Sequence, residues 1–303
     1  MAKRKSTKYV RIFLAAIVAG LLLLGFYHQN NPINTLFRSI GLVEAPVSNT
    51  SESRIIVIDV GQGNSIFIQS GSRTVLIDAG EAEYGGKVVS ILQKAGVSKL
   101  DLVIATHPHS DHIGGLKAVL EKIPTDKILM PQIPEAIVPT TAVYTNLLKT
   151  IAEKKISVEI PKAGQGYELD SGVLEIVGPL KQYDDLNNNS IVARLVYGEN
   201  SFLFCGDAEK QAEYDMVGSG AVLSSNVMVL GHHGSNTSST ARFLSAVNPQ
   251  NAIISVGKDN PYNLPSTQVI KSLFAKIYRT DLNGSITIDM NEKTYSITSE
   301  GVN

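Results

Sequence analysis

The segment Ala105–Leu116, ATHPHSDHIGGL, places three of the chain's six histidines and an aspartate within six residues. The apolar run LDLVIAT leads into it, which predicts a buried strand that ends just before His107. A two-residue step lets the side chains of His107 and His109 point to one side, and Asp111 and His112 follow about one turn later. Zinc, manganese and iron bind imidazole and carboxylate groups in proteins. The segment therefore predicts a metal-binding loop at the C-terminal end of a strand.

Composition sets the size and the charge of the fold. The chain has 303 residues, of which 43% are hydrophobic, enough for one large domain or two small ones. Residues 1–49 hold six Lys/Arg and one acidic residue, which leaves 21 basic and 27 acidic residues in the rest. This excess of acidic residues argues against a domain that binds nucleic acid through a broad basic surface, although a local groove can still be positive. The single cysteine, Cys205, excludes an intramolecular disulfide framework and a cysteine-rich zinc module.

The N-terminus has the pattern of a targeting segment. MAKRKSTKYVR is basic, and Ile12–Tyr27 carries no charge over sixteen residues. We predict an uncleaved signal anchor within 1–29, with a cleaved signal peptide as the second interpretation and a buried core helix as the third. The basic flank should stay in the cytoplasm, so we expect a cell-membrane protein with an extracytoplasmic domain, or a secreted one if the segment is cleaved. Residues 30–53 are polar and turn-rich and are predicted to form a tether.

The rest of the chain, 54–303, alternates strand-like and helix-like patterns. β-Rich runs separated by Gly/Ser turns begin at Arg54, and GGKVVSILQKAGV then has apolar residues at helical spacing. Helices are also expected near 116–121, 144–155, 240–247 and 266–276, with strands between them. A hairpin is expected in SITIDMNEKTYSITS. This pattern indicates an α/β domain in which helices cover mixed sheets. No feature of the sequence identifies a protein partner.

The motif His107-x-His109-x-Asp111-His112 resembles the signature of the metallo-β-lactamase superfamily. The resemblance implies a four-layer αβ/βα sandwich with a one- or two-metal site between its sheets. Further along, FLFCGDA resembles the family's strand-ending Gly-Asp and makes Asp207 the candidate bridging ligand. VLGHHGS resembles the family's later histidine, at His233 or His232.

The blocks IDVGQGNS, LIDAG, ATHPHSDHIGGL, NNNSIV, FLFCGDAE, GHHGS and YRTDLNGSITI together resemble the ComEC-like branch, the extracytoplasmic hydrolase domains of DNA-uptake proteins. Three departures stand out. The histidine that many superfamily members have between the first cluster and Gly-Asp is absent, as it is in the branch. Asn64 stands where the branch usually has Asp, and Leu264 where it usually has His. An oxygen of Asn187, Asn188 or Asn189 could replace the absent histidine as a ligand of the first metal.

The resemblance implies two divalent ions, zinc or manganese. Two such ions about 3.5–4 Å apart lower the pKa of a bridging water and supply a hydroxide as the nucleophile. Asp111 is the candidate catalytic residue because it would bind one ion and orient that hydroxide. The candidate metal ligands are His107, His109, Asp111, His112, Asp207 and His233.

Other polar residues are candidates for supporting roles. Asp59 and Asp78 each end a strand, where they could accept the free N–H of a ligating imidazole. Ser235 and Asn236 could donate hydrogen bonds to a substrate, although the same residues are common in ordinary turns.

The resemblance favours hydrolysis of a phosphodiester, either in nucleic acid or in a cell-surface polymer. A lactone or β-lactam substrate is disfavoured, because the groups that cleave those rings usually keep the middle histidine. The departures at Asn64 and Leu264 leave a metal-poor or inactive binding module as the alternative. The membrane would be contacted through the N-terminal helix alone.

Overall fold

The computed structural model describes residues 53–301. The signal anchor predicted within 1–29 and nearly all of the tether predicted over 30–53 lie outside the described residues, so both stay predictions. Within 53–301, none of the helices combines the length and the apolar character needed to cross a membrane.

Two mixed β-sheets form the centre of this domain. The first has eight strands in the order β15-β14-β1-β2-β3-β4-β5-β6. Its strands β1 to β4 pair in sequence, and β3, β4, β5 and β6 run parallel. The strands of this sheet are β1 (Ser53–Val57), β2 (Ile66–Ser70), β3 (Arg73–Ile77), β4 (Leu100–Ile104), β5 (Thr125–Leu129), β6 (Ser157–Glu159), β14 (Ile286–Met290) and β15 (Tyr295–Ser299).

The second sheet has seven strands in the order β13-β12-β11-β10-β9-β8-β7. Strands β7 to β10 form antiparallel pairs, whereas β10, β11, β12 and β13 run parallel. The strands are β7 (Gly166–Leu169), β8 (Gly172–Gly178), β9 (Val192–Tyr197), β10 (Asn200–Phe204), β11 (Val227–Val229), β12 (Asn251–Ile254) and β13 (Lys276–Arg279).

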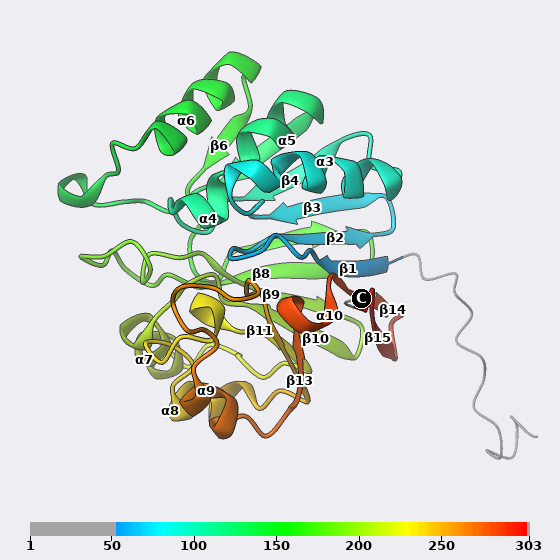
Figure 1. The fold of residues 1–303 in the computed structure, drawn as a ribbon, viewed down its shortest axis with the longest axis vertical. Helices are drawn as coiled ribbons and strands as arrows, with labels where there is room; N and C mark the ends of the chain where they lie inside the picture. The colour runs from blue at the N-terminus through cyan, green and yellow to red at the C-terminus, as the bar shows by residue number, and fades with distance from the viewer. Residues whose placement is uncertain (1–52, 302–303) are drawn as a thin grey trace, which may run out of the picture. The chain divides into compact units, whose positions relative to one another are not determined.

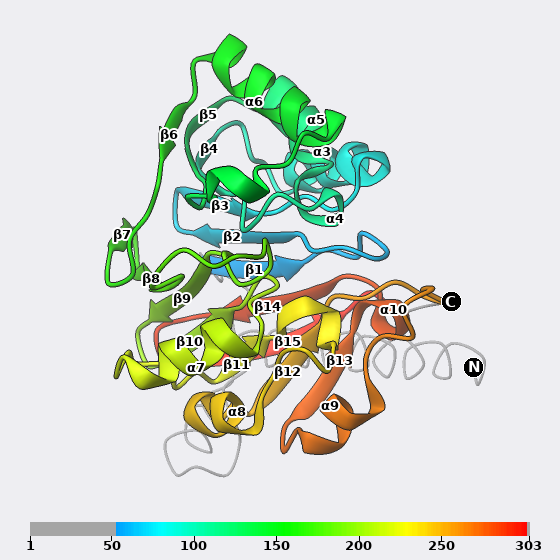
Figure 2. The same cartoon turned by 90° about the vertical axis from the view of Figure 1, so that its left-hand side faces the viewer.

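Helices cover the outer face of each sheet (Figures 1 and 2). One apolar cluster fills the space between the sheets, a second lies between the first sheet and its helices, and a third lies between the second sheet and its helices. The helices over the first sheet are α3 (Gly85–Lys94), α5 (Leu116–Lys122) and α6 (Ala142–Lys154). Those over the second are α7 (Lys210–Gly218), α8 (Ala241–Val247) and α9 (Thr267–Ser272). The predicted four-layer αβ/βα sandwich is confirmed.

The strands have near-continuous apolar sequences because both of their faces are buried. In β1, Ile55 and Val57 face the other sheet, while Ile56 packs against the helix side. In β10, Phe202 and Phe204 enter the cluster between the sheets. Successive side chains of a strand point to opposite faces, so a sheet covered on both sides must be apolar at odd and even positions.

The parallel strands of both sheets direct their carboxyl ends to the same edge of the sandwich. The loop after β4 carries the first histidine cluster, the loop after β10 carries Asp207, and the loop after β11 carries His232 and His233. Hydrogen bonds join the sheets there: Ile191 N donates to Thr106 O at 2.9 Å. Ligands are commonly bound outside the carboxyl ends of parallel strands.

Several elements lay beyond the sequence patterns. Helix α7 and strands β5, β6, β7 and β13 were not predicted, and α9 ends at Ser272, four residues before the predicted end. Strands β6 and β7 have only three and four residues, and α7 is only weakly amphipathic. Local pattern therefore carried little signal for them.

Glu213 of α7 provides a test of stability that is separate from the metal ligands. Its side chain is buried and accepts hydrogen bonds from the backbone N–H groups of Ser239 and Thr240. Burial raises its pKa from 4.5 to about 7, despite these hydrogen bonds. Between these two values the folded protein keeps the proton while the unfolded chain releases it, so rising pH favours unfolding.

We therefore expect the free energy of unfolding of the parent, measured relative to Glu213→Gln, to fall by about 3 kcal/mol as the pH rises through this interval. Urea unfolding of both proteins in EDTA at a series of pH values measures the difference. A difference that stays flat with pH would contradict the raised pKa.

Candidate metal centre

The loop after β4 is held by backbone contacts that leave no room for side chains. The backbone N–H of Asn64 donates to Asp111 O at 3.0 Å, and that of Ala79 donates to His112 O at 2.8 Å. A Cβ atom on Gly115 would lie 2.2 Å from Ala79 O, and one on Gly63 would lie 2.5 Å from Asp111 O. Glycine is required at both positions for this close approach. The short helix α4 (Ser110–Ile113) is thereby fixed against β3 and its following loop.

Four of the predicted ligands form one group. Asp111 Oδ2 lies 3.2 Å from His233 Nε2 and 3.9 Å from His112 Nε2. Asp207 Oδ1 lies 3.1 Å from His112 Nε2, and Asp207 Oδ2 lies 3.7 Å from His233 Nε2. The loops after β4, β10 and β11 each contribute to this group.

The remaining predicted ligands also gather around Asp207. His107 Nε2 is 3.0 Å from His109 Nδ1 and 3.8 Å from Asp207 Oδ2. His232 Nε2 lies 3.9 Å from the same Asp207 oxygen. Asp207 thus lies near both sets of ligand atoms, and His107, His112 and Asp207 are also close enough together to hold one ion.

These atoms are spaced as ligands of a common ion would be. Two atoms that each lie about 2.1 Å from one ion are roughly 3.0–3.4 Å apart when they are neighbours in its coordination shell. His112 Nε2 is buried and makes no hydrogen bond within residues 53–301, although Asp207 Oδ1 lies 3.1 Å from it. The two atoms are close without being aligned for a hydrogen bond, as expected of two ligands that face an ion. The residues present therefore fit a divalent metal.

The charge of the cluster supports the same conclusion. Asp78 and Asp207 are almost fully buried, and Asp111 is mostly buried. Among the described residues, the ion-pair partners of these three carboxylates are all histidines, not lysines or arginines. Buried carboxylates require nearby positive charge. Protons on the histidines or metal ions can supply it.

The pKa values follow from this arrangement. Burial lowers the pKa of His107 well below its usual value and lowers that of His109, so both rings are neutral and able to bind metal. Burial also opposes a charge on His112, but the carboxylates of Asp207 and Asp78 raise its pKa well above the usual value. Asp111 and Asp207 keep lowered pKa values despite burial, because charged histidines lie beside them. Metal binding here would displace the histidine protons.

Asp78 orients His112 through the ring nitrogen that faces away from the other ligands. It is fully buried, and its Oδ2 accepts hydrogen bonds from His112 Nδ1 at 2.7 Å, Thr106 Oγ1 at 2.7 Å and Asn64 Nδ2 at 3.0 Å. Its Oδ1 accepts the backbone N–H of Thr106 at 2.8 Å. Because a carboxylate only accepts, the proton sits on His112 Nδ1, which directs the Nε2 lone pair at the cluster. His233 is held similarly, since its Nδ1 donates to Ser255 O at 2.7 Å.

The three adjacent asparagines mainly hold their own loop. Asn189 Oδ1 accepts from Tyr183 N at 3.1 Å, and Asn188 Oδ1 accepts from Ala212 N at 3.0 Å. Asn187 Nδ2 donates to Glu209 Oε1 at 3.1 Å, and its Oδ1 is buried without a hydrogen-bond partner in the described domain. Of the three side-chain oxygens, that of Asn187 alone is left without a donor.

The other predicted residues are placed as follows. Asp59 forms an ion pair with Lys87 at 3.3 Å and accepts the Gly61 N–H, so it holds no imidazole among the described residues. Ser235 is buried in the wall of the cavity that contains the ligands, whereas Asn236 is exposed and lines a neighbouring depression.

The two departures from the branch have structural accounts. Asn64 donates to Asp78, where an aspartate would set a second carboxylate against the first. Leu264 lines the cavity and packs partly against the apolar cluster under the second sheet, so its side chain supplies no ligand atom.

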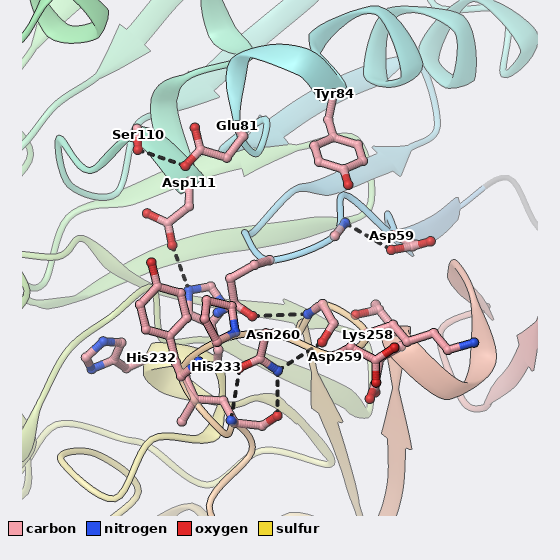
Figure 3. Close-up of a pocket in the computed structure, with 18 of the residues that line it drawn as sticks. Asp59, Glu81, Tyr84, Ser110, Asp111, His232, His233, Lys258, Asp259 and Asn260 are labelled. Atoms are coloured by element: carbon pink, nitrogen blue, oxygen red, sulfur yellow. Dashed lines mark hydrogen bonds and ion pairs between the residues drawn. The ribbon is translucent and has the colours of Figure 1, made fainter.

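An open cavity of about 910 Å³ lies between the two halves of the sandwich and is lined by His109, Asp111, Asp207, His232 and His233. Figure 3 shows Asp111 directed from the upper half at His233 on the lower half, with His232 beside it. Acidic side chains dominate the outer lining, against a single Lys258. The acidic residues there are Asp59, Glu81, Glu83, Asp259 and Asp281.

Sequence reasoning missed several residues that support the ligands. Thr106 lies within hydrogen-bond distance of both His107 Nδ1 and His112 Nδ1, besides its bonds to Asp78. Glu209 and Thr237 contact His232 Nδ1 at 3.0 and 2.9 Å. Glu209 could have been suspected from the sequence, because it stands two residues after Asp207. The Ser255 carbonyl that accepts from His233 is a backbone group, and no residue type marks it in the sequence.

Comparison with known proteins agrees with this geometry. The profile of the Metallo-beta-lactamase superfamily matches residues 58–258. The competence protein ComA of Neisseria gonorrhoeae is 36% identical over 245 residues, which cover 78% of this chain and 32% of ComA. Ribonuclease Z of Clostridioides difficile (strain 630) is 43% identical over 60 residues, 20% of this chain and 19% of that protein. The chain spans about a third of the length of curated relatives such as ComA.

A solved structure shares the fold. YhfI from Bacillus subtilis, described as a metallo-beta-lactamase fold protein, aligns with a TM-score of 0.50 and 12% sequence identity, over 75% of this chain and 96% of that chain. The matched profile covers two thirds of this chain and includes both groups of ligands. The chain therefore belongs to the metallo-beta-lactamase superfamily of metal-dependent hydrolases and is similar to its ComEC-like competence proteins.

Proposed function

We propose that this protein is a metal-dependent phosphodiesterase that uses two divalent ions, zinc or manganese. The observation that carries the proposal is the pair of ligand groups that share Asp207 at the floor of an open cavity. Two ions held there would activate water at neutral pH and take up charge on a phosphate oxygen. Asp111, whose Oδ2 lies 3.2 Å from His233 Nε2, would bind one of these ions and orient the hydroxide.

The chain offers no competing thiol nucleophile. Cys205 is its only cysteine, and it packs in the apolar cluster under the second sheet. Burial raises the pKa of its thiol well above the usual value. Water activated at the metal centre is therefore the nucleophile that we propose.

The named relatives support a phosphodiester as the substrate. The name ribonuclease Z describes cleavage of an RNA phosphodiester, and ComA is named for competence. The acidic cavity lining opposes a long polyanion except where the metals and Lys258 offset it. We therefore include a small diester, single-stranded DNA and a surface phosphodiester polymer as substrates in the test, with a lactone and a β-lactam for comparison.

Asp111→Asn is the decisive variant. We expect kcat/KM for bis(4-nitrophenyl) phosphate to fall by at least about 100-fold, because a neutral amide is a weaker ligand and orients a hydroxide less well. Asp259→Asn is the matched control, since Asp259 lines the same cavity and is exposed. That variant should keep activity close to the parent's.

The alternative is a binding module. It would be supported if the protein loaded with zinc or manganese hydrolysed none of the diesters while Asp111→Asn bound a surface polymer as well as the parent did. Hydrolysis of the lactone or β-lactam alone would instead identify a different bond as the target.

A further inference from the structure

We propose that His232 is the fourth ligand of the ion held by His107, His109 and Asp207. It would replace the histidine that the chain lacks between Asp111 and Asp207. The inference rests on the proposed function, because it completes one half of the same two-ion centre.

The position of the ring supports this role. His232 Nε2 lies 3.9 Å from Asp207 Oδ2, and His107 Nε2 lies 3.8 Å from that same oxygen. Ligand atoms around an octahedral ion are separated by about 3.0 Å when adjacent and about 4.2 Å when opposite. Both separations are longer than that of adjacent ligands, and an ion between these groups would draw them roughly 0.5–1 Å closer together. His232 also lines the cavity that His109 and Asp207 line.

The tautomer of His232 is the one that a metal requires. Its Nδ1 lies 3.0 Å from Glu209 Oε1 and 2.9 Å from Thr237 Oγ1. Glu209 as a carboxylate can only accept, so Nδ1 carries the proton and Nε2 keeps its lone pair. Asn187 Nδ2 donates to the same Glu209 oxygen at 3.1 Å and holds it in place. Carboxylates that accept from the second nitrogen of a ligating imidazole are typical of metal sites.

The backbone explains how two consecutive histidines reach one carboxylate. His232 and His233 both adopt left-handed conformations, with φ of 50° and 53°. In an extended strand, consecutive side chains would point to opposite sides. Here both Nε2 atoms lie within 3.9 Å of Asp207 Oδ2. Left-handed conformations are strained for residues other than glycine, and they cluster at functional sites.

The asparagines fit this role less well. The side-chain oxygens of Asn188 and Asn189 already accept backbone N–H groups. Asn187 contacts Glu209, and through it acts on His232. Asn187 is thus a positioning residue in this proposal, and its unpartnered Oδ1 is the competing fourth donor.

The test measures metal binding, not turnover. Full-length parent, His232→Ala, Glu209→Gln and Asn236→Ala are equilibrated with a zinc buffer, and zinc per chain is measured by plasma mass spectrometry. We expect the affinity for the weaker ion to fall by at least about 100-fold in His232→Ala and by about 10-fold in Glu209→Gln. Asn236→Ala is the matched control on the same loop, and it should bind as the parent does.

X-ray absorption of the zinc-loaded proteins counts imidazole ligands directly, and His232→Ala should lower that count. The proposal is overturned if His232→Ala binds both ions with the parent's affinity, even if its activity is lost, because His232 would then contact the substrate. It is also overturned if Asn187→Ala releases the ion and His232→Ala does not. A parent that binds two ions and hydrolyses no diester would refute the proposed function and leave this ligand assignment standing.

Discussion

If the parent binds two zinc ions per chain as proposed, Asp207→Ala is expected to bind at most one. The reason is the position of this carboxylate: its Oδ1 lies 3.1 Å from His112 Nε2, and its Oδ2 lies 3.8 Å from His107 Nε2. Removing it would take a ligand from both of the proposed ions and leave a cavity between their histidines. Because loss of an outer partner of a ligand already costs about 10–100-fold, we expect phosphodiester hydrolysis to fall by more than about 100-fold.

Metal content by plasma mass spectrometry and a hydrolysis assay on the same samples measure both effects. Asp126→Ala serves as the control, since the Asp126 side chain is 56% exposed and pairs only with Lys99 among the described residues. That variant should keep two ions and full activity. Two tightly bound ions in Asp207→Ala would show that this residue does not bridge them.

Asp78→Asn is expected to cost about 3–5 kcal/mol of the free energy of unfolding, measured in EDTA. Four donors converge on the Asp78 carboxylate: His112 Nδ1, the N–H and hydroxyl of Thr106, and Asn64 Nδ2. An amide in its place turns one acceptor into a donor that faces other donors, in a fully buried position. The backbone does not add to the cost, because asparagine tolerates the left-handed conformation of this residue, φ 58°.

Urea unfolding of the parent and the variant, with equal m values, gives the difference. Asp170→Asn is the matched control: Asp170 also accepts hydrogen bonds from a backbone N–H and a hydroxyl, both of Ser72, but its side chain is 39% exposed. We expect the control to lose much less than Asp78→Asn does, because an exposed carboxylate stays hydrated in both states. Equal losses in the two variants would contradict the role given to the buried carboxylate. In Asp78→Asn, zinc affinity should also fall by about 10–100-fold, because His112 loses its orientation.

Much of the fold could be predicted from the sequence, since its strongest signals are local. Helices α3 and α6 have apolar residues at helical spacing, and strands β4 and β10 are short apolar runs. Each pattern reflects which faces of that segment are buried, so it can be read from the segment alone. The edge strands β6 and β7 escaped prediction because segments of three and four residues are too short to show a clear pattern.

The candidate site divides in the same way. His107, His109, Asp111 and His112 were recognisable because all four stand within one six-residue segment after a strand. Side chains so close in sequence must also lie close in space. The role predicted for Asp78 also agrees with its contact to His112, whereas Asp59, with the same strand-ending pattern, pairs with Lys87 instead. The pattern alone could not separate the two carboxylates.

The sequence by itself determined the superfamily, the layered α/β architecture and the residue types available to hold metal, because these depend on local spacing and on burial of strand and helix faces. Only the tertiary structure decided how the distant segments share one centre. Asp207 reaches both groups of histidines because β10 and β4 end at the same edge of two facing sheets. His232 reaches Asp207 because two consecutive residues adopt left-handed backbone conformations and because Glu209 holds its ring. Those contacts join residues far apart in the chain, and their geometry is set by sheet pairing and loop conformation, which no single segment specifies.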